Sequence, residues 1–278
     1  MKLALISSFY EKSKRFHQEC LKSIANQTDT NFVAILFGDN FNLELLNHKL
    51  GCQVEYEFVT NLTPREIKAL GIQKALNLGC DYICFIDSDD FMSEQRINFY
   101  KKMINVKKFD ILIHNLTTIR SDSSIIKNNA LKLRSGYYKK EFFYKKNISG
   151  FGNTLYKTDL LKMLLPFPDN SLSLDWEVIS VLSFSSKIYS LDKSLTFYRQ
   201  HDDNEIGLYK KWNKERLDIR IKSRDLHYSY LRSFFPKSST INKLEENWKK
   251  KKSIIIKNKK NYLKKLTNYK NLYWQELI

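Results

Sequence analysis

The chain has 278 residues, of which 42% are hydrophobic and 14% aromatic. This composition excludes a disordered chain, and the length suffices for one large domain or for one domain with an appendage. No run approaches the ~18 uncharged apolar residues that span a bilayer. The apolar opening, residues 2–6, is too short for a signal peptide. We therefore expect a cytoplasmic protein.

The formal net charge of +17 is concentrated at the C-terminal end. Residues 206–278 contain 20 Lys and Arg against 6 Asp and Glu, which leaves 27 against 24 for the first 205 residues. The basic character therefore belongs to a C-terminal extension.

Short apolar runs alternate with helical patterns through the first ~120 residues, which predicts βαβ units around a mostly parallel sheet. A helix is expected around residues 16–24, and a second begins at Pro64 and ends near Gly79. The expected strands cover residues 3–6, 32–37, 54–59, 82–86 and 111–116.

The regular alternation ends after residue 116. Residues 120–150 are expected to form loops, and 150–153 a tight turn. Helices are then expected at 158–165 and from Asp175, with strands at 186–191 and 194–198. Two long amphipathic helices follow, divided at Pro236. The four cysteines fit no zinc or redox spacing, so we expect them in the core.

Three carboxylates, Asp87, Asp89 and Asp90, directly follow the expected strand at 82–86. Ligands of open α/β sheets bind at the carboxyl ends of the strands. Carboxylates this close raise one another's pKa, and a divalent cation such as Mg²⁺ or Mn²⁺ would relieve the conflict and bridge to phosphate oxygens. The alternative is a solvated acidic turn before the helix that begins near Ser93.

Asp39 also follows an expected strand and would lie in the same crevice if the strands are neighbours. Its carboxylate could accept an N–H group of a nucleobase, or it could form a local turn with Asn40. Phe9 and Tyr10 follow the first strand and could stack on a base or pack as a lid.

The order SSFYEK, GDN, a helix begun by proline and YICFIDSDD resembles the nucleotide-sugar half of family 2 glycosyltransferases of the GT-A fold. SGFGNTLYKTDLL, LDWEVISVL and LTFYRQHDDN resemble the acceptor segment of that family. The resemblance implies a catalytic domain at 1–205 with a nucleotide-sugar half (1–118) and an acceptor half (119–205). Residues 206–278 would be a basic helical extension.

The family resemblance implies roles for the acidic residues and a Mn²⁺ or Mg²⁺ cofactor. Asp39 would contact the base, most naturally uracil or thymine. Asp87 would bind ribose or support the metal, with Ser88 beside it at the nucleotide. Asp89 would be the direct metal ligand, and Asp90 would orient the loop.

Asp175 matches the family's general base, which deprotonates the acceptor hydroxyl and gives inversion at the anomeric carbon. Leu174 replaces the Glu that usually precedes it. Asp175 could instead cap its helix, with Ser173 as a rival cap. Glu177 is a second candidate base. Trp176 could face an acceptor sugar or belong to the core.

The resemblance also implies phosphate and metal roles for residues of two further motifs. Arg199 would close over the diphosphate, and His201 could ligate the metal. The family's Arg-Asn pair corresponds here to Lys68 and Ala69, so Lys68 takes the phosphate role with Arg65 as its alternative.

The implied activity is inverting, metal-dependent transfer of a sugar from a nucleotide-diphosphate donor to a cell-surface glycan or lipid-linked acceptor, as in lipopolysaccharide or capsule synthesis. The expected donor is UDP-linked. Gly152 and Asn153 would let the backbone approach the acceptor. A sugar nucleotidyltransferase is the related alternative, although the glycine-rich basic loop of such enzymes is missing. A non-enzymatic basic module is the third hypothesis.

The basic extension interleaves lysines with aromatic residues, a pattern that suits the anionic inner face of a membrane. It could equally form a helical cap with a solvated lysine face. Nucleic-acid binding is the weakest alternative, because the segment matches no known module.

Overall fold

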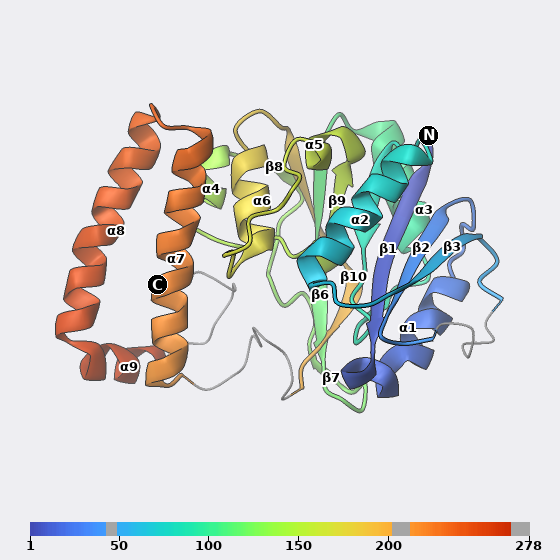
Figure 1. Ribbon diagram of the computed structural model, residues 1–278, viewed down its shortest axis with the longest axis horizontal. Helices are drawn as coiled ribbons and strands as arrows, with labels where there is room; N and C mark the ends of the chain where they lie inside the picture. Colours follow the sequence, from blue (N-terminus) through green and yellow to red (C-terminus); the bar gives the residue numbers. More distant parts are fainter. Residues whose placement is uncertain (43–48, 202–211, 268–278) are drawn as a thin grey trace. The chain divides into compact units, whose positions relative to one another are not determined.

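The computed structural model describes residues 1–42, 49–201 and 212–267. These residues form two compact units, and each unit is described by itself (Figure 1). Unit 1 comprises Met1–Tyr138, Ser149–Phe167 and Ser186–His201, within the described ranges. Unit 2 comprises Lys139–Ile148, Pro168–Ser185 and the described residues from 212 onward.

The described part of unit 1 is built on a ten-stranded sheet with the order β3-β2-β1-β4-β9-β6-β10-β5, with β7 beside β6 and β8 beside β10. The strands are β1 (Leu3–Tyr10), β2 (Val33–Asp39), β3 (Gln53–Val59), β4 (Tyr82–Phe85), β5 (Phe91–Met92), β6 (Ile111–Ile119), β7 (Ile125–Lys127), β8 (Gly136–Tyr138), β9 (Thr154–Lys157) and β10 (Ile188–Arg199).

The sheet is mostly parallel, as the sequence predicted. Strands β3, β2, β1 and β4 pair in parallel, and β6 pairs in parallel with β10. The antiparallel strand β9 lies between β4 and β6. Carboxyl ends of parallel strands share one edge, and Tyr10 at the end of β1 is in register with Asp39 at the end of β2.

Helices cover the sheet of unit 1 (Figure 1). They are α1 (Lys14–Ala25), α2 (Pro64–Asn77), α3 (Arg96–Val106), α5 (Thr158–Lys162) and the 3₁₀ turns η1 (Glu11–Ser13) and η3 (Phe151–Asn153). Thr63 and Glu66 form a capping box at the start of α2. Gly71 lets α2 approach the sheet closely, because a Cβ there would lie 2.7 Å from Cγ2 of Ile6.

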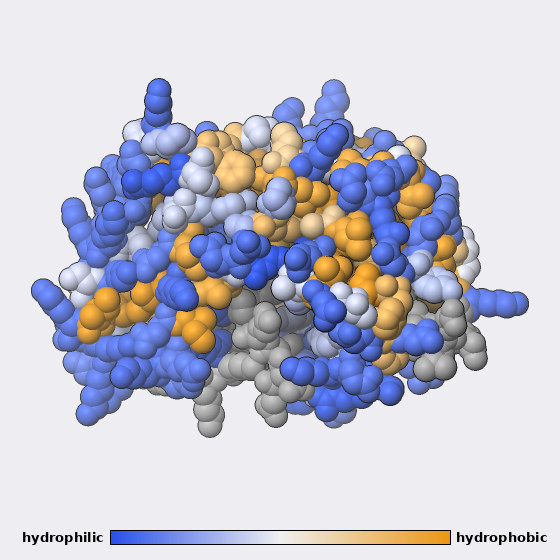
Figure 2. Space-filling view, in the orientation of Figure 1, coloured by the Kyte–Doolittle hydropathy of each residue, from blue (hydrophilic) through white to orange (hydrophobic). Residues whose placement is uncertain are grey.

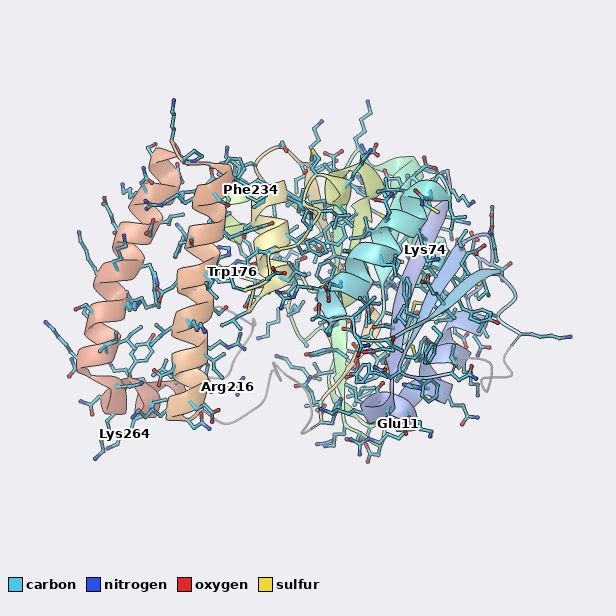
Figure 3. The ribbon with its side chains drawn as sticks, in the orientation of Figure 1. Glu11, Lys74, Trp176, Arg216, Phe234 and Lys264 are labelled. Carbon is cyan, nitrogen blue, oxygen red and sulfur yellow. The ribbon has the colours of Figure 1, made fainter. Side chains whose placement is uncertain are left out.

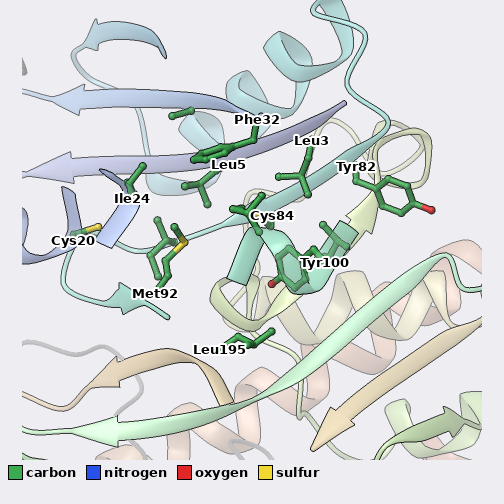
Figure 4. Close-up of a cluster of buried hydrophobic side chains, with 14 of the residues drawn as sticks. Leu3, Leu5, Cys20, Ile24, Phe32, Tyr82, Cys84, Met92, Tyr100 and Leu195 are labelled. Atoms are coloured by element: carbon green, nitrogen blue, oxygen red, sulfur yellow. The ribbon is translucent and has the colours of Figure 1, made fainter. Parts of the chain in front are cut away.

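The core of unit 1 is a cluster of buried side chains from β1, β2, β4, α1 and α3 (Figure 4). Cys20 and Cys84 belong to this cluster, Cys80 is also buried, and Cys52 is half-buried. All four thiols are free, which agrees with their expected role as small apolar residues.

Unit 2 is helical, with α4 (Lys140–Phe143), α6 (Leu174–Leu182), α7 (Lys214–Phe234), α8 (Ser239–Lys257) and α9 (Lys259–Thr267). The division of the C-terminal helices falls at Pro236, as predicted. Within the described ranges, every helix is too short or too polar to cross a membrane.

The compact units do not follow the boundary that we expected at residue 205. Helix α6 packs on α7, and the Trp176 ring stacks on His227 with centroids 3.6 Å apart and planes at 7°. Figure 3 shows Trp176 between these two helices. Residues 168–185 therefore share a core with the helical extension rather than forming one body with all of 119–205.

Several boundaries differ from the sequence prediction. The expected loop at 120–150 contains β7, β8 and α4, which are too short to show a periodic pattern. The two strands expected at 186–191 and 194–198 are one strand, β10, with irregular register between Leu191 and Thr196. Strand β1 extends to Tyr10, beyond the apolar run that predicted it.

Candidate active site

The acidic loop, Asp87 to Asp90, follows β4 at the edge where β1 and β2 also end. A backbone hydrogen bond from Asp90 N to Asp87 O, 3.0 Å long, closes the loop as a turn. Asp89 and Asp90 are buried, whereas the Asp87 side chain is 48% exposed. The loop therefore exposes the carboxylate of Asp87 and buries those of Asp89 and Asp90.

Asp89 lies beside His201, and the resemblance implied a metal role for both residues. His201 Nε2 lies 2.9 Å from Asp89 Oδ2, and both side chains are largely buried. The imidazole packs against the Phe16 ring with centroids 5.3 Å apart. The fold thus brings together a carboxylate oxygen and a ring nitrogen from positions 112 residues apart.

Asp90 is the most strongly perturbed acid of the loop. Burial raises its pKa well above the ordinary value, and the charges of Asp89 and Asp87 raise it further. Its Oδ1 accepts a hydrogen bond from the Arg199 backbone N–H at 2.7 Å. This environment suits the orienting role expected for Asp90.

Arg199 does not have the exposed position that a diphosphate ligand requires. Its side chain is 1% exposed, and Nε donates to the Asp89 carbonyl at 2.7 Å. The guanidinium also donates to Glu19, to the Ser123 hydroxyl and to the carbonyls of residues 120 and 121. The expected diphosphate role is therefore wrong for Arg199, which anchors the acidic loop to α1 and to the loop after β6.

Glu19 was not identified from the sequence as part of this network. Its carboxylate pairs with Arg199 and accepts from Ser123 Oγ at 2.8 Å. The partners are separated by 180 and 104 residues, so no local pattern could connect them.

Lys68 lies beside the open carboxylate of the loop. Its Nζ is 3.8 Å from Asp87 Oδ1 and 5.7 Å from the centre of the Phe151 ring. Gly152 lies on the same side, since a Cβ there would be 4.0 Å from Oδ2 of both Asp87 and Asp90. The alternative cation Arg65 is half-buried in the first turn of α2, next to Glu66.

Tyr10 and Asp39 end neighbouring strands at the same edge. Burial raises the pKa of the Tyr10 hydroxyl, and Asp89 and then Asp87 raise it further, so the ring lies near the acidic loop. Asp39 is half-buried, and its Oδ1 accepts from Asn40 Nδ2 at 2.9 Å. The side chains of Asp39 and Asn40 thus pair with each other, and the Asp39 carboxylate lies at the carboxyl edge of the sheet.

Phe9 and Ser88 are interior residues, which contradicts their expected contact with a nucleotide. Phe9 is fully buried and meets the His17 ring edge-on at 5.0 Å, because alternate side chains of β1 face the core. Ser88 is also fully buried, and its hydroxyl lies 2.7 Å from Ser13 Oγ, which lies 2.7 Å from His17 Nε2.

This buried Ser88–Ser13–His17 chain holds the acidic loop against α1 and was not predicted. The signal in the sequence was the spacing of four between Ser13 and His17, which places both on one helix face. Burial lowers the pKa of His17 to about 4, so the ring is neutral at physiological pH.

Asn153 is also structural rather than an acceptor contact. Its Nδ2 donates to the His114 carbonyl at 2.7 Å, and its Oδ1 accepts from the Gly150 N–H at 2.6 Å. The buried amide fixes the 3₁₀ turn η3, and this turn carries Gly152 to the acidic loop.

Asp175 lies in the first turn of α6 in unit 2. Ser173 is the N-cap residue, although its side chain makes no capping hydrogen bond. Asp175 Oδ1 accepts from the Trp176 N–H at 2.8 Å, and Oδ2 accepts from Asn147 Nδ2 at 3.2 Å. Burial raises the pKa of Asp175, while these two hydrogen bonds and Arg220 oppose the rise.

The other two candidates on α6 are core residues. Glu177 is buried, so its carboxyl cannot reach an acceptor as a second base. Trp176 is fully buried, stacks on His227 and donates from Nε1 to the Phe143 carbonyl at 2.6 Å. Its ring therefore offers no face to a sugar, and the core alternative is correct.

The two metal ligands expected from the sequence, Asp89 and His201, lie together at the acidic loop. Within residues 1–42, 49–201 and 212–267, no group of three or more His, Cys, Asp or Glu side chains is arranged to hold a metal ion. Asp89 and His201 together provide one oxygen and one nitrogen donor. This pair fits Mn²⁺ or Mg²⁺ if diphosphate oxygens and water complete the coordination.

Comparison with known proteins assigns the fold. The chain has the fold of the S. aureus TarS glycosyltransferase. Residues 1–349 of TarS in complex with UDP-GlcNAc match with a TM-score of 0.61 and 16% identity, over 84% of this chain and 71% of that one. A longer TarS structure matches with a TM-score of 0.60 and 17% identity, over 86% of this chain and 44% of that one. The α/β fold predicted from the sequence is thereby confirmed.

One relative is similar in sequence as well. An uncharacterised glycosyltransferase, MJ1057 of Methanocaldococcus jannaschii, is 24% identical over 222 residues, which are 75% of this chain and 74% of that protein. No family model matches the chain. Both comparisons agree with the resemblance that the sequence motifs carry.

Proposed function

We propose that this protein is an inverting glycosyltransferase that uses a UDP-linked sugar donor and Mn²⁺ or Mg²⁺. The observation that carries the proposal is the contact between Asp89 and His201 at the carboxyl edge of a sheet whose fold is that of TarS. The complex of TarS with UDP-GlcNAc and the glycosyltransferase name of the archaeal relative support the same activity.

The donor is proposed to lie along the ends of β1, β2 and β4. Asp39 would accept the imide N–H of uracil, and Tyr10 would border the base. Asp87 would bind ribose hydroxyls, and the Lys68 ammonium would approach the diphosphate. A divalent cation held by Asp89 and His201 would neutralise charge on the departing diphosphate when bound.

Asp175 is the proposed general base. Its carboxylate would take the proton of the acceptor hydroxyl while that oxygen bonds to the anomeric carbon and the bond from this carbon to the diphosphate oxygen breaks. UDP leaves, and attack opposite the leaving group inverts the configuration. The raised pKa of Asp175 suits this role because a base works best when its pKa approaches the operating pH.

The acceptor is proposed to be a cell-surface glycan or a lipid-linked saccharide. Lysines of the helical extension would approach an anionic membrane face, where each contributes about 1 kcal/mol. Ile254 and Ile256 of α8 are 62% and 55% exposed, and Figure 2 shows hydrophobic residues among hydrophilic ones over this part of the molecule. This mixture is typical of interfacial helices.

Ligand-induced thermal stabilisation tests the proposal. UDP and UDP-GlcNAc should raise the melting temperature in the presence of Mn²⁺ and less so with EDTA, because a ligand that binds only the folded state stabilises it. GDP and CDP should have smaller effects if Asp39 selects uracil.

A panel without any response to nucleotide diphosphates or nucleotide sugars, with and without Mn²⁺, would contradict the proposal. Release of pyrophosphate from UTP and a sugar 1-phosphate would instead indicate a nucleotidyltransferase.

A further inference from the structure

Unit 2 contains a basic groove that the donor site does not use. It is a cavity of 330 Å³ between α7, α8 and the segment after α4. Four of its eight lining residues are Lys or Arg, and none of the eight is acidic. The lining includes the four cations Lys145, Lys146, Arg224 and Lys251.

Arg224 is the fixed cation of the basic groove. Its side chain is buried, and its guanidinium lies 5.3 Å from the ring centres of both Trp176 and Trp248. One terminal nitrogen donates to the Lys145 carbonyl at 2.7 Å. Burial lowers the pKa of Arg224, which indicates that its surroundings disfavour the charge.

The positive charges of the groove repel one another. Desolvation by neighbouring protein atoms lowers the pKa of Lys251, and the charge of Arg224 lowers it further. Two carboxylates of α7 and α8 bind other partners: Asp225 accepts from Trp248 Nε1 and Lys252 Nζ, and Glu245 pairs with Arg232 and Lys249. An anion in the groove would relieve this repulsion.

Trp176 links the groove to the proposed base within unit 2. Arg224 packs on the ring of Trp176, and Trp176 directly follows Asp175 on α6. The cavity is large enough for a diphosphate with part of a sugar. Trp248 and Tyr228 provide aromatic surface in its lining.

We propose that the basic groove binds a phosphate or diphosphate group of the acceptor, so that the acceptors are phosphorylated saccharides. This inference rests on the proposed function, because it names the class of acceptor for that transfer. The phosphate could come from the diphosphate of a lipid carrier or from a phosphodiester within a glycan. Cationic side chains recognise the same oxygens in both.

Calorimetric titration with inorganic pyrophosphate at low ionic strength tests the groove. The double variant Lys145→Glu/Lys251→Glu reverses two exposed lining charges and keeps Arg224 in its packed position. The matched control is Lys243→Glu/Lys250→Glu, which makes the same charge change on exposed lysines of α8 that do not line the groove. Divalent cations are left out of every titration, so that the proposed metal site does not bind pyrophosphate.

We expect the lining variant to weaken pyrophosphate binding at least tenfold and the control to weaken it less than twofold. Equal weakening in both variants would show that the effect comes from the total charge of the protein rather than from the groove. This result would overturn the proposal. Farnesyl diphosphate and a glycerol phosphodiester distinguish the two sources, because tighter binding of one identifies it. Binding only to phosphatidylglycerol vesicles, with neither soluble probe bound, would overturn the proposal in favour of a membrane surface.

The outcomes separate this inference from the proposed function. Pyrophosphate binding that depends on Lys145 and Lys251 in a protein without UDP binding would retain the groove and reject the glycosyltransferase. Sugar transfer with an acceptor KM unchanged by the lining variant would retain the enzyme and reject the groove.

Discussion

The two units position their polar groups by different means. In unit 1, parallel strands end at one edge, so the backbone itself brings Tyr10, Asp39 and the acidic loop together. In unit 2, side-chain packing positions the polar groups. The stack of Trp176 on His227 fixes α6, and the amide of Asn147 fixes the Asp175 carboxylate. Geometry set by a sheet is visible in a sequence, whereas geometry set by packing is not.

The two units also gather charges of opposite sign. Unit 1 gathers carboxylates that repel one another, and Arg199 anchors their loop. Unit 2 gathers cations around Arg224 that favour an anion. Four substitutions test this comparison, and they follow from the largest expected effect to the smallest.

Asp89→Ala should lower kcat/KM for sugar transfer about 10³-fold, because a group that stabilises leaving-group charge is lost. Stabilisation by UDP should also lose its dependence on Mn²⁺, as thermal shift would show. The control is Asp159→Ala, which removes an exposed carboxylate at the start of α5. Full transfer activity in the Asp89 variant would refute the donor site.

Arg199→Lys should lower the free energy of unfolding by about 3 kcal/mol, because a buried, multiply bonded guanidinium cannot be replaced by an ammonium. Urea denaturation measures the change, and Arg120→Lys at the surface should cost under about 0.5 kcal/mol. If stability is unchanged while the KM for the donor rises, Arg199 binds diphosphate after all and the anchoring role is wrong.

Trp176→Phe should lower the free energy of unfolding by about 2 kcal/mol, because the Phe143 carbonyl loses its buried donor and the stack on His227 is smaller. UDP binding should be unaffected, since the change lies in unit 2. Ile219→Ala on α7, where the side chain is 50% exposed, is the control and should cost little. Wild-type stability with a raised acceptor KM would indicate a sugar platform instead.

Asn147→Ala should shift the acidic limb of the pH profile of kcat/KM to higher pH. The Asn147 amide donates to Asp175 and stabilises its charged form, which lowers the pKa. Without it the pKa rises, so the base is protonated at a higher pH and activity fails earlier on acidification. Asn242→Ala, an exposed change on α8, should leave the limb in place.

An acidic limb that moves to lower pH, or does not move, would show that Asp175 is not the titrating base.

The sequence predicted what strand order determines. Apolar runs located β1, β2 and β4, and the aspartates after them had to share an edge once these strands paired in parallel. The family resemblance gave His201 and Asp89 a shared metal role, and the structure places their side chains 2.9 Å apart. The burial of Arg199 could not be predicted, because its anchor Glu19 is 180 residues away.

In unit 2, the sequence could not predict which side chains are buried. The segment LDWEVISVL contains the candidate base Asp175 and the core residues Trp176 and Glu177. Periodicity alone does not tell which of these side chains faces inward, because α6 packs against α7. The division into units depends on the contact between α6 and α7, for which the sequence carried no local sign.

The missing side chain at Gly71 has a consequence for the donor site. With no Cβ to hold them apart, α2 and β1 meet at the contact between Gly71 and Ile6. Lys68 stands three residues earlier on the same helix and reaches Asp87 from there. A methyl group at position 71 would force Ile6 or α2 to shift. A shift of α2 would change the distance between the Lys68 ammonium and the Asp87 carboxylate.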